Sequence, residues 1–162
     1  MKIAVLGIIK DPRSGDILLA EKKGVEEIGE GMLTGPGGKI VPPETPEECL
    51  HRETLEEWKL ELEMHSIRQV ALIDFYAAGA VDFRVHILTA HVASGTPCET
   101  EIFKMPKWYP PSGIPFDRTY EGDRFWLPKV LAGEKFRANV YYLDRAKNLD
   151  PNRPPEFFPF EH

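Results

Sequence analysis

Apolar residues along this chain fall into short runs separated by turn-forming residues, a pattern typical of strands. Residues 2–9 (KIAVLGII) form one run, and residues 17–21 (ILLAE) follow it after a turn that contains proline and glycine. This pair predicts an opening β-hairpin. Residues 67–77 and 81–93 form a second pair, joined by the small residues 77–80 (AAGA), and predict another hairpin.

Three further elements are predicted in the second half of the chain. Residues 107–109 (KWY) predict a short strand, and the alternation in residues 135–143 (KFRANVYYL) predicts a last strand. Residues 123–132 (DRFWLPKVLA) predict a helix, because their apolar positions recur at helical spacing and Gly133 stands where a helix cap would fall. Pro128 lies inside this helix, so we expect a kink or a late start.

Two segments show neither a strand period nor a helix period. Residues 24–39 contain six glycines, so we expect a loop with several special backbone conformations. Residues 149–162 are rich in proline, and we expect an irregular C-terminal tail whose phenylalanines cover the body of the protein. No linker or internal repeat divides residues 1–148, which we therefore expect to form one domain.

The strongest helix signal begins at Thr45. Thr45 is a favoured N-cap, Pro46 suits the first helical position, and Glu48 completes a capping box. Near the end of the helix, Lys59 stands where a glycine would be favoured. The order of strands, a strong helix, more strands, a second helix and a final strand predicts an α+β domain with helices around a mixed sheet.

The composition is that of an ordinary folded domain, with 162 residues of which 42% are hydrophobic and 28% are charged. The net charge of −6 argues against a general nucleic-acid-binding surface, so we expect no stable nucleic-acid partner. Cys49 and Cys98 lie far apart and lack metal-ligand spacing, which favours a reduced intracellular protein. The apolar runs are too short for a signal peptide or a membrane span, so we expect a cytoplasmic protein that does not bind membranes.

Glutamates gather on one face of the first predicted helix. Glu53, Glu56 and Glu57 stand at positions i, i+3 and i+4, where like charges repel and weaken a helix. One interpretation is a solvated acidic face relieved by Arg52 and Lys59. The other is a metal site, because carboxylate oxygens suit Mg²⁺ or Mn²⁺, and bound cations would let an acidic protein accept a polyphosphate. The glycine-rich segment directly before the helix favours the metal site.

The same segment resembles the Nudix box, G-x5-E-x7-R-E-U-x-E-E-x-G-U, in which U is a bulky aliphatic residue. Seven positions match in register and without a gap: Gly38, Glu44, Arg52, Glu53, Glu56, Glu57 and Leu60. Two positions depart from the pattern, since Thr54 replaces an aliphatic residue and Lys59 replaces the last glycine. Neither departure removes an acid. The resemblance implies a metal-dependent hydrolase with an α/β/α sandwich around a mixed sheet.

The resemblance also implies which residues bind metal and activate water. The metal, Mg²⁺ or Mn²⁺, would be held by the carbonyl of Gly37 or Gly38 and by three acids: Glu53, Glu56 and Glu57. A further acid is expected from the loop after the central strands, where Glu101 is the first candidate and Glu99 the second. The base that takes a proton from water would be Glu56, Glu57 or Glu101.

Two other roles follow from the same resemblance. Arg52 would be structural, pairing with Glu44 or Glu53 and fixing the direction of the acids. Lys22 or Lys23 lies where a lysine near the phosphates is expected, although each is otherwise a lysine at the end of a strand.

Outside the box, the likeness extends to the branch of the family that hydrolyses oxidised purine nucleoside triphosphates. The lead into the box, residues 35–39 (GPGGK), is similar to that of the branch. Base recognition differs, because Thr34 stands where the branch has an Asn. Where the branch has a Trp and two adjacent Asp residues, this chain has Tyr120, Gly122 and Asp123. Tyr120 can stack on a purine, and Asp123 can share a proton with a base edge or serve as the N-cap of the second helix.

The expected function is Mg²⁺-dependent hydrolysis of an oxidised purine nucleoside triphosphate such as 8-oxo-dGTP to the monophosphate and pyrophosphate. We expect a monomer that cleans the nucleotide pool and whose partner is a small nucleotide. Within the same chemistry, the alternatives are an ordinary dNTP, an RNA 5′ triphosphate end and a nucleotide sugar. A nucleotide sensor without turnover is the alternative from another class, and the intact acids speak against it.

Overall fold

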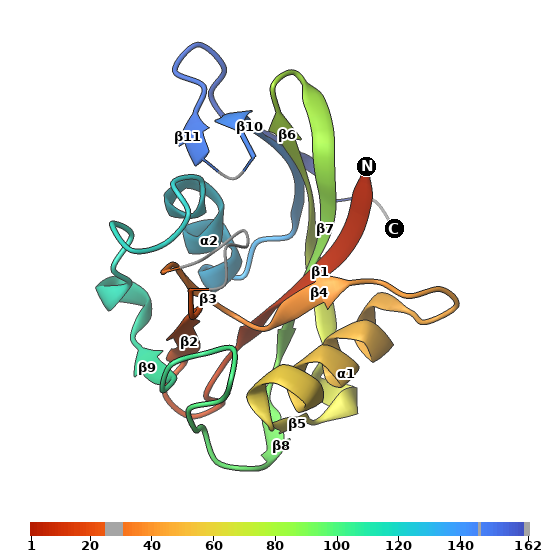
Figure 1. Cartoon of the computed structure of the whole chain (residues 1–162), viewed down its shortest axis with the longest axis vertical. Helices are drawn as coiled ribbons and strands as arrows, with labels where there is room; N and C mark the ends of the chain where they lie inside the picture. Colours follow the sequence, from red (N-terminus) through yellow and green to blue (C-terminus); the bar gives the residue numbers. More distant parts are fainter. Residues whose placement is uncertain (25–30, 146, 161–162) are drawn as a thin grey trace.

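The computed structural model describes residues 1–24, 31–145 and 147–160. A mixed seven-stranded sheet forms its centre, with the strand order β11-β10-β6-β7-β1-β4 and with β12 also paired to β10 (Figure 1). Its strands are β1 (Lys2–Ile9), β4 (Gly37–Lys39), β6 (Arg68–Ala77), β7 (Ala80–Ala90), β10 (Phe136–Asp144), β11 (Lys147–Leu149) and β12 (Glu156–Pro159). The pairs β1–β7 and β6–β10 are parallel, whereas β6–β7 and β1–β4 are antiparallel.

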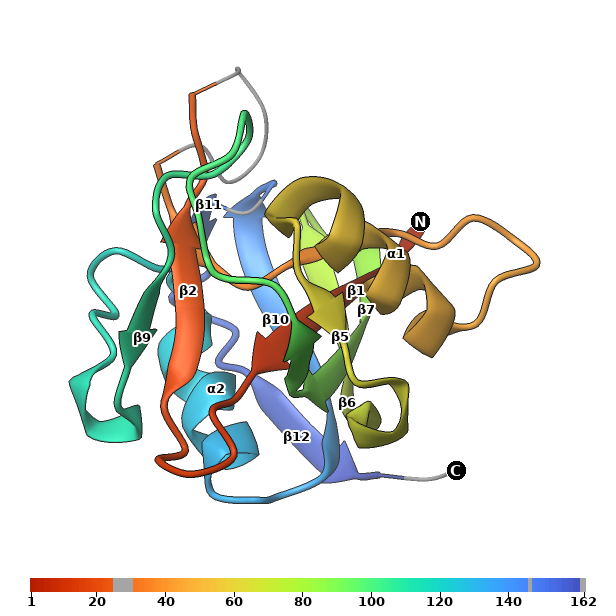
Figure 2. The same ribbon diagram turned by 90° about the horizontal axis from the view of Figure 1, so that it is seen from below.

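Two small sheets and two helices complete the fold. The order β3-β2-β9 makes one small sheet, and β5 pairs with β8 in the other. The bounds are β2 (Ile17–Glu21), β3 (Leu33–Thr34), β5 (Glu61–Leu62), β8 (Val92–Ser94), β9 (Lys107–Tyr109), α1 (Pro46–Trp58) and α2 (Asp123–Leu131), with 3₁₀ turns at Met64–Ser66 and Pro111–Gly113. Figures 1 and 2 show α1 and α2 on different sides of the central sheet.

The two helices cover opposite faces of the sheet because successive side chains of a strand point to opposite faces. Ala4 and Ile8 of β1 belong to the core that includes Trp126 of α2. Val5 and Ile9 of the same strand belong to the core that includes α1. The predicted α+β class, a mixed sheet with helices on both faces, is confirmed.

Helix α1 begins as its sequence predicts. The Thr45 side chain accepts a hydrogen bond from the backbone N–H of Glu48, and the Glu48 side chain accepts one from the N–H of Thr45. Lys59 follows the helix in the left-handed conformation at φ 57°, the geometry for which a glycine is favoured. Cys49 and Leu50 are on the buried side of the helix, and Cys49 is a free thiol.

Of the two predicted hairpins, only one forms. Strands β6 and β7 pair antiparallel, from Arg68 in β6 up to the turn that precedes Ala80 in β7, as predicted. Strands β1 and β2 do not form a hairpin, because β1 pairs in the central sheet and β2 in a small one. A single isolated β-bridge, between Lys10 and Ile17, connects the end of β1 with the start of β2. Both faces of β1 are buried, so this strand lies inside the central sheet rather than at the edge of a hairpin.

The glycine-rich segment and the chain end are more regular than predicted. Strands β3 and β4 lie within residues 24–39, of which 25–30 are outside the described residues. Gly31 has a positive φ of 77°, but the later glycines of this segment do not. Strand β12 lies in the segment expected to be irregular, β11 ends at the first residue of that segment, and Phe157 packs against the main core as expected.

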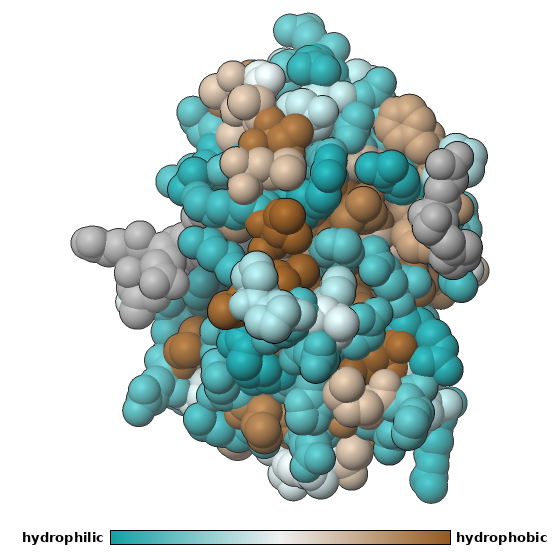
Figure 3. All heavy atoms as spheres, turned by 90° about the vertical axis from the view of Figure 1, so that its right-hand side faces the viewer, coloured by the Kyte–Doolittle hydropathy of each residue, from teal (hydrophilic) through white to brown (hydrophobic). Residues whose placement is uncertain are grey.

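The face of the molecule on which α1 and β4 lie is mainly hydrophilic in Figure 3, with apolar residues in small groups among the polar ones. Among the described helices, none is both long enough and apolar enough to cross a bilayer.

Candidate active site

The acidic face of α1 is organised by one cation, Arg52. Its guanidinium makes two contacts with Glu44, Nη2–Oε1 at 2.7 Å and Nε–Oε2 at 3.0 Å. Its Nη1 lies 2.9 Å from Oε1 of Glu53 and 3.3 Å from Oε2 of Glu56. The hydrogen bond from Arg52 is the main reason that the pKa of Glu44 falls to about 2. Arg52 therefore offsets the repulsion that the bunched acids create.

Glu57 differs from the other acids because it has no recorded contact with Arg52 among the described residues. It is partly buried, and this burial is the main cause that raises the pKa of its carboxyl group above the usual range. The neighbouring Glu53 adds to the rise by hydrogen bonding and charge repulsion, whereas Lys22 opposes it. The arrangement places a readily protonated carboxyl beside a cation at the inner end of the acidic face.

Strand β4 brings backbone directly against these acids. A Cβ atom on Gly38 would overlap the carboxyl group of Glu53, and one on Gly37 would overlap the carbonyl oxygen of Val5 in β1. These glycines are thus explained by close approach and not by unusual φ angles. The backbone of Gly38 therefore lies directly against the carboxyl group of Glu53, and the carbonyl of Lys39 accepts a hydrogen bond from Arg52.

The donor set on α1 suits a divalent cation by its chemistry. It offers carboxylate and carbonyl oxygens, the ligands that Mg²⁺ prefers. Within residues 1–24, 31–145 and 147–160, however, no group of three or more His, Cys, Asp or Glu side chains is arranged to hold a metal ion. Arg52 occupies oxygens of both Glu53 and Glu56. Each contact uses one oxygen of its carboxylate, so the second oxygen of Glu53 and of Glu56 could bind a cation while Arg52 keeps the first.

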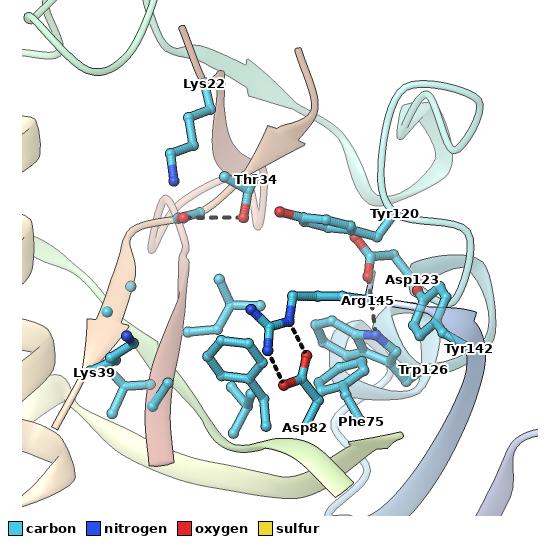
Figure 4. Close-up of a pocket in the computed structure, with 18 of the residues that line it drawn as sticks. Lys22, Thr34, Lys39, Phe75, Asp82, Tyr120, Asp123, Trp126, Tyr142 and Arg145 are labelled. Carbon is cyan, nitrogen blue, oxygen red and sulfur yellow. Dashed lines mark hydrogen bonds and ion pairs between the residues drawn. The ribbon is translucent and has the colours of Figure 1, made fainter. Parts of the chain in front are cut away.

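A cavity of about 410 Å³ connects the acidic face with the start of α2. Figure 4 shows Lys22 and Lys39 on one side of it and Asp123 on the other, with the Tyr120 hydroxyl directed toward Thr34. Seven of the sequence-predicted site residues line it: Lys22, Thr34, Gly37, Gly38, Glu57, Tyr120 and Asp123. A single pocket therefore joins the residues expected to handle phosphates with those expected to handle a base.

Asp123 faces this pocket and does not cap α2. It is the first residue of the helix, the N-cap is Gly122, and no side chain caps the helix start. The Asp123 carboxylate instead accepts a hydrogen bond of 3.1 Å from Nε1 of the buried Trp126. Burial raises the pKa of Asp123 to about 7 and that of Tyr120 to about 12. The alternative of an N-cap is thus wrong, because Gly122 holds the N-cap position and no side chain caps the helix start.

The missing side chain at Gly122 has a local structural reason. A Cβ atom there would lie 2.8 Å from the hydroxyl oxygen of Tyr142 and 2.9 Å from Cγ1 of Val140. The backbone N–H of Gly122 donates a 2.9 Å hydrogen bond to the same Tyr142 hydroxyl. Tyr142 of β10 therefore occupies the space beside the start of α2.

The two candidate lysines and the two loop acids lie in different surroundings. Lys22 lines the pocket. Lys23 instead forms an ion pair of 2.7 Å with Glu99 and donates to the carbonyl of Thr100 at 2.6 Å. Glu101 is exposed, and neither it nor Glu99 lines the pocket. The hydroxyl of Thr34 donates to the carbonyl of Gly35 at the pocket wall.

Sequence reasoning missed much of the pocket. Eight further lining residues come from β6, β7, α2, β10 and the turn after β10: Phe75, Tyr76, Asp82, Phe83, Val85, Trp126, Tyr142 and Arg145. The alternation in the predicted hairpin places positions 75 and 83 each on an inward face, which gave a weak signal. No pattern in the sequence indicates that this face meets α2 and the turn after β10 around an open cavity.

Comparison with known proteins finds the same family and a similar fold. The family described as "NUDIX domain" matches residues 1–130. A protein named "Oxidized purine nucleoside triphosphate hydrolase" from Mus musculus is 34% identical over 130 residues, covering 80% of each chain. A protein of the same name from Danio rerio is 32% identical over 136 residues, covering 83% of each chain. The crystal structure of a NUDIX hydrolase from Nitrosomonas europaea superposes with a TM-score of 0.71 at 17% identity, covering 86% of this chain and 78% of that one.

These similarities define the class of protein. The chain belongs to the Nudix family and is a Nudix hydrolase, an enzyme that acts on phosphoanhydride bonds. Members of the family generally use divalent metal ions.

Proposed function

We propose that this enzyme hydrolyses oxidised purine nucleoside triphosphates such as 8-oxo-dGTP to the monophosphate and pyrophosphate. The observation that carries the proposal is the single cavity that runs from Glu57 and Gly38 to Tyr120 and Asp123. It gives a nucleotide one end rich in carboxylates and backbone groups and another with a half-buried aromatic and a buried carboxyl. The names of the two animal relatives support the same substrate class.

At the acidic end, we propose that a divalent cation, Mg²⁺ or Mn²⁺, is held by the carbonyl of Gly37 and by three acids: Glu53, Glu56 and Glu57. The bound cation would neutralise phosphate charge and lower the pKa of water. When no cation is bound, the positive charge of Arg52 keeps the carboxylates of Glu44, Glu53 and Glu56 directed toward one another.

The protein's own acids also provide the candidates for the base. Glu57 lines the cavity and has a raised pKa, so it is the acid of α1 best placed to take a proton from water. Glu56 is 58% exposed and Glu101 lies outside the cavity wall, so both remain candidates that would need to move toward the substrate.

The remaining predicted roles follow the two ends of the cavity. Lys22, rather than Lys23, would contact the phosphates, since Lys22 lines the cavity and Lys23 does not. Tyr120 would stack on the base, with Thr34 and Asp123 at its edge. A carboxyl whose pKa is about 7 can donate one hydrogen bond and accept another near neutral pH. We propose a monomeric, cytoplasmic enzyme that cleans the nucleotide pool.

The test is pyrophosphate release with Mg²⁺ from 8-oxo-dGTP, dGTP, dATP and a 5′-triphosphorylated RNA, with Glu56→Gln as the inactive control. We expect preferred turnover of 8-oxo-dGTP by the native chain and little by the variant. Equal turnover of the three dNTPs would keep the chemistry and reject the substrate preference. Preferred turnover of the RNA would move the substrate to RNA ends. No turnover of any of the four would reject the triphosphate substrate and favour a nucleotide sugar or a sensor.

A further inference from the structure

An ion pair on the cavity wall has no place in the function proposed so far. Arg145, in the turn after β10, contacts Asp82 at the start of β7 through two hydrogen bonds, Nε–Oδ2 at 2.7 Å and Nη2–Oδ1 at 2.8 Å. Both residues line the cavity. Strand β6 lies between β10 and β7 in the sheet, so the pair reaches over β6. Figure 4 shows the Arg145 side chain extending across the cavity toward Asp82.

Asp82 holds the guanidinium in one orientation. Its side chain is only 14% exposed, and a second cation, Lys2, lies 3.9 Å from it. A two-point contact fixes the plane of a guanidinium as well as its position. Arg145 itself keeps a side chain that is 50% exposed, so its donors stay accessible from the cavity side.

The surroundings of this guanidinium suit a flat heteroaromatic ring. Phe75 and Phe83 line the same part of the cavity, and Tyr142 lies three residues before Arg145 with its ring 6.4 Å from that of Phe75. Aromatic walls bury the faces of a base and leave its edge to polar groups. At this place the polar groups are those of the Asp82–Arg145 pair.

The hydrogen-bonding capacity of Arg145 determines which base edge fits. A guanidinium has five N–H donors and no acceptor. Two of the five donate to Asp82, and the described part of the chain provides no recorded acceptor for the other three. A base that covers these donors must offer acceptors, because a buried donor without a partner is costly. The O6 atom of a 6-oxopurine is an acceptor, whereas the N6 amino group of adenine is a donor.

We propose that Arg145, positioned by Asp82, is a specificity-determining residue that donates hydrogen bonds to the base of the bound nucleotide and favours 6-oxopurines over 6-aminopurines. The inference rests on the proposed function only in that the ligand is a purine nucleotide. It adds a hydrogen-bond donor, Arg145 in the turn after β10, to the carboxyl group that Asp123 of α2 supplies. A structural ion pair at the surface would instead contribute little and leave base preference unchanged.

The test measures binding without turnover. The dissociation constants of dGMP, 8-oxo-dGMP and dAMP are measured by calorimetry in EDTA for the native chain, Arg145→Leu, Arg145→Lys and Asp82→Asn. The matched control is Arg84→Leu, which removes another two-point Arg–Asp pair, with Asp74, from the same hairpin but outside the cavity wall.

We expect the native chain to prefer dGMP and 8-oxo-dGMP to dAMP. Arg145→Leu should reduce that preference about tenfold or more, the size of a lost two-point contact to a base edge. Arg145→Lys should give a smaller reduction, because it keeps the charge but loses the fork. Asp82→Asn should also reduce the preference in part, and Arg84→Leu should leave it unchanged.

Two outcomes would overturn the inference: no 6-oxopurine preference in the native chain, or the same preference in Arg145→Leu as in the native chain, including the case in which Arg145→Leu loses affinity equally for all three nucleotides. Pyrophosphate release from the native chain separates the two proposals. Turnover of 8-oxo-dGTP with unchanged selectivity in Arg145→Leu would reject only the role of Arg145. A loss of selectivity in a chain that hydrolyses no triphosphate would reject only the proposed function.

Discussion

Two carboxyl groups with raised pKa values lie at opposite ends of the cavity, Glu57 on α1 and Asp123 on α2. Burial is the first cause of the rise for both residues, but their neighbours differ. Glu57 lies beside another carboxylate and opposite Lys22, whereas Asp123 accepts a hydrogen bond from Trp126. Desolvation thus raises the pKa of both acids, while their different neighbours suit them to different tasks.

Asp123 gives a prediction about stability and pH. Its folded-state pKa of about 7 lies above the unfolded value of 3.8, so between these values the folded state holds a proton that the unfolded state has lost. The contribution of Asp123 to the free energy of unfolding should therefore fall as pH rises from about 4 to 7, by on the order of 4 kcal/mol in total. Asp123→Asn should remove this contribution and leave that of Glu57, whose pKa is also raised.

The measurement is urea unfolding of the native chain and of Asp123→Asn at pH 5, 6, 7 and 8. The difference in unfolding free energy between the two proteins should change from pH 5 to 7 and level off by pH 8. Asn at position 123 can still accept the hydrogen bond from Trp126, so the substitution tests the charge alone. A difference that stays constant from pH 5 to 8 would contradict the assigned pKa.

At the scale of one element, α1 combines a well-capped helix with an acidic face that opposes its stability. The capping box at Thr45 and the contacts of Arg52 compensate for part of the repulsion. Another face of the helix carries Leu50 and Trp58, whose buried side chains pack into the core and fix the helix on the sheet. Packing and capping together therefore hold the helix, and with it the bunched acids, in an arrangement that the repulsion among the acids alone would disfavour.

Helix α1 should be stabilised by divalent cations if its acids bind one. We expect Mg²⁺ to raise the melting temperature of the native chain, because a ligand that binds only the folded state stabilises it. Glu56→Gln should reduce this rise, since it removes one carboxylate from the acidic face. The measurement is thermal unfolding followed by circular dichroism, with and without Mg²⁺.

Glu47→Gln is the matched control for this prediction. Glu47 belongs to the same helix, but at 100° per residue it lies away from the face shared by Glu53, Glu56 and Glu57. It should keep the full effect of Mg²⁺. An equal loss of the effect in both variants would show that Mg²⁺ acts through the overall negative charge rather than at a site on α1.

At the scale of the whole molecule, the end of the chain closes the central sheet. Strand β12 pairs with the edge of β10 from Phe136 to Asn139, and β11 pairs farther along the same edge. The ring of Phe157 stands nearly perpendicular to that of Phe136, with centroids 5.4 Å apart. Residues that a sequence pattern assigns to a tail thus complete the core behind the cavity.

This arrangement predicts different effects for two adjacent phenylalanines. Phe157→Ala should lower the free energy of unfolding by about 1–3 kcal/mol, since it removes a ring packed on the main core. Phe158, which is 45% exposed, points to the other side of β12, and its replacement by alanine should cost less than about 0.5 kcal/mol. Urea unfolding of both variants provides the measurement. Equal effects would contradict the role of β12 in the core.

Much of the fold follows from local patterns. The capping box of α1, the β6–β7 hairpin and the short strand β9 all form where the sequence predicts them, because their signals lie within a few residues. The opening hairpin does not form, since β1 pairs with β4 and β7 instead, and β7 lies more than 70 residues away. Strand pairing at such distance leaves no local signal.

The sequence by itself determined the acidic face of α1, the glycines that lead into it and the helix that carries it, because spacing along one helix translates directly into position in space. Only the tertiary structure decided what lies across the cavity. Asp82, Asp123 and Arg145 come from three separate elements and meet through sheet pairing and helix packing. Their proximity depends on contacts between distant segments, and these contacts arise only when the whole chain buries its two cores.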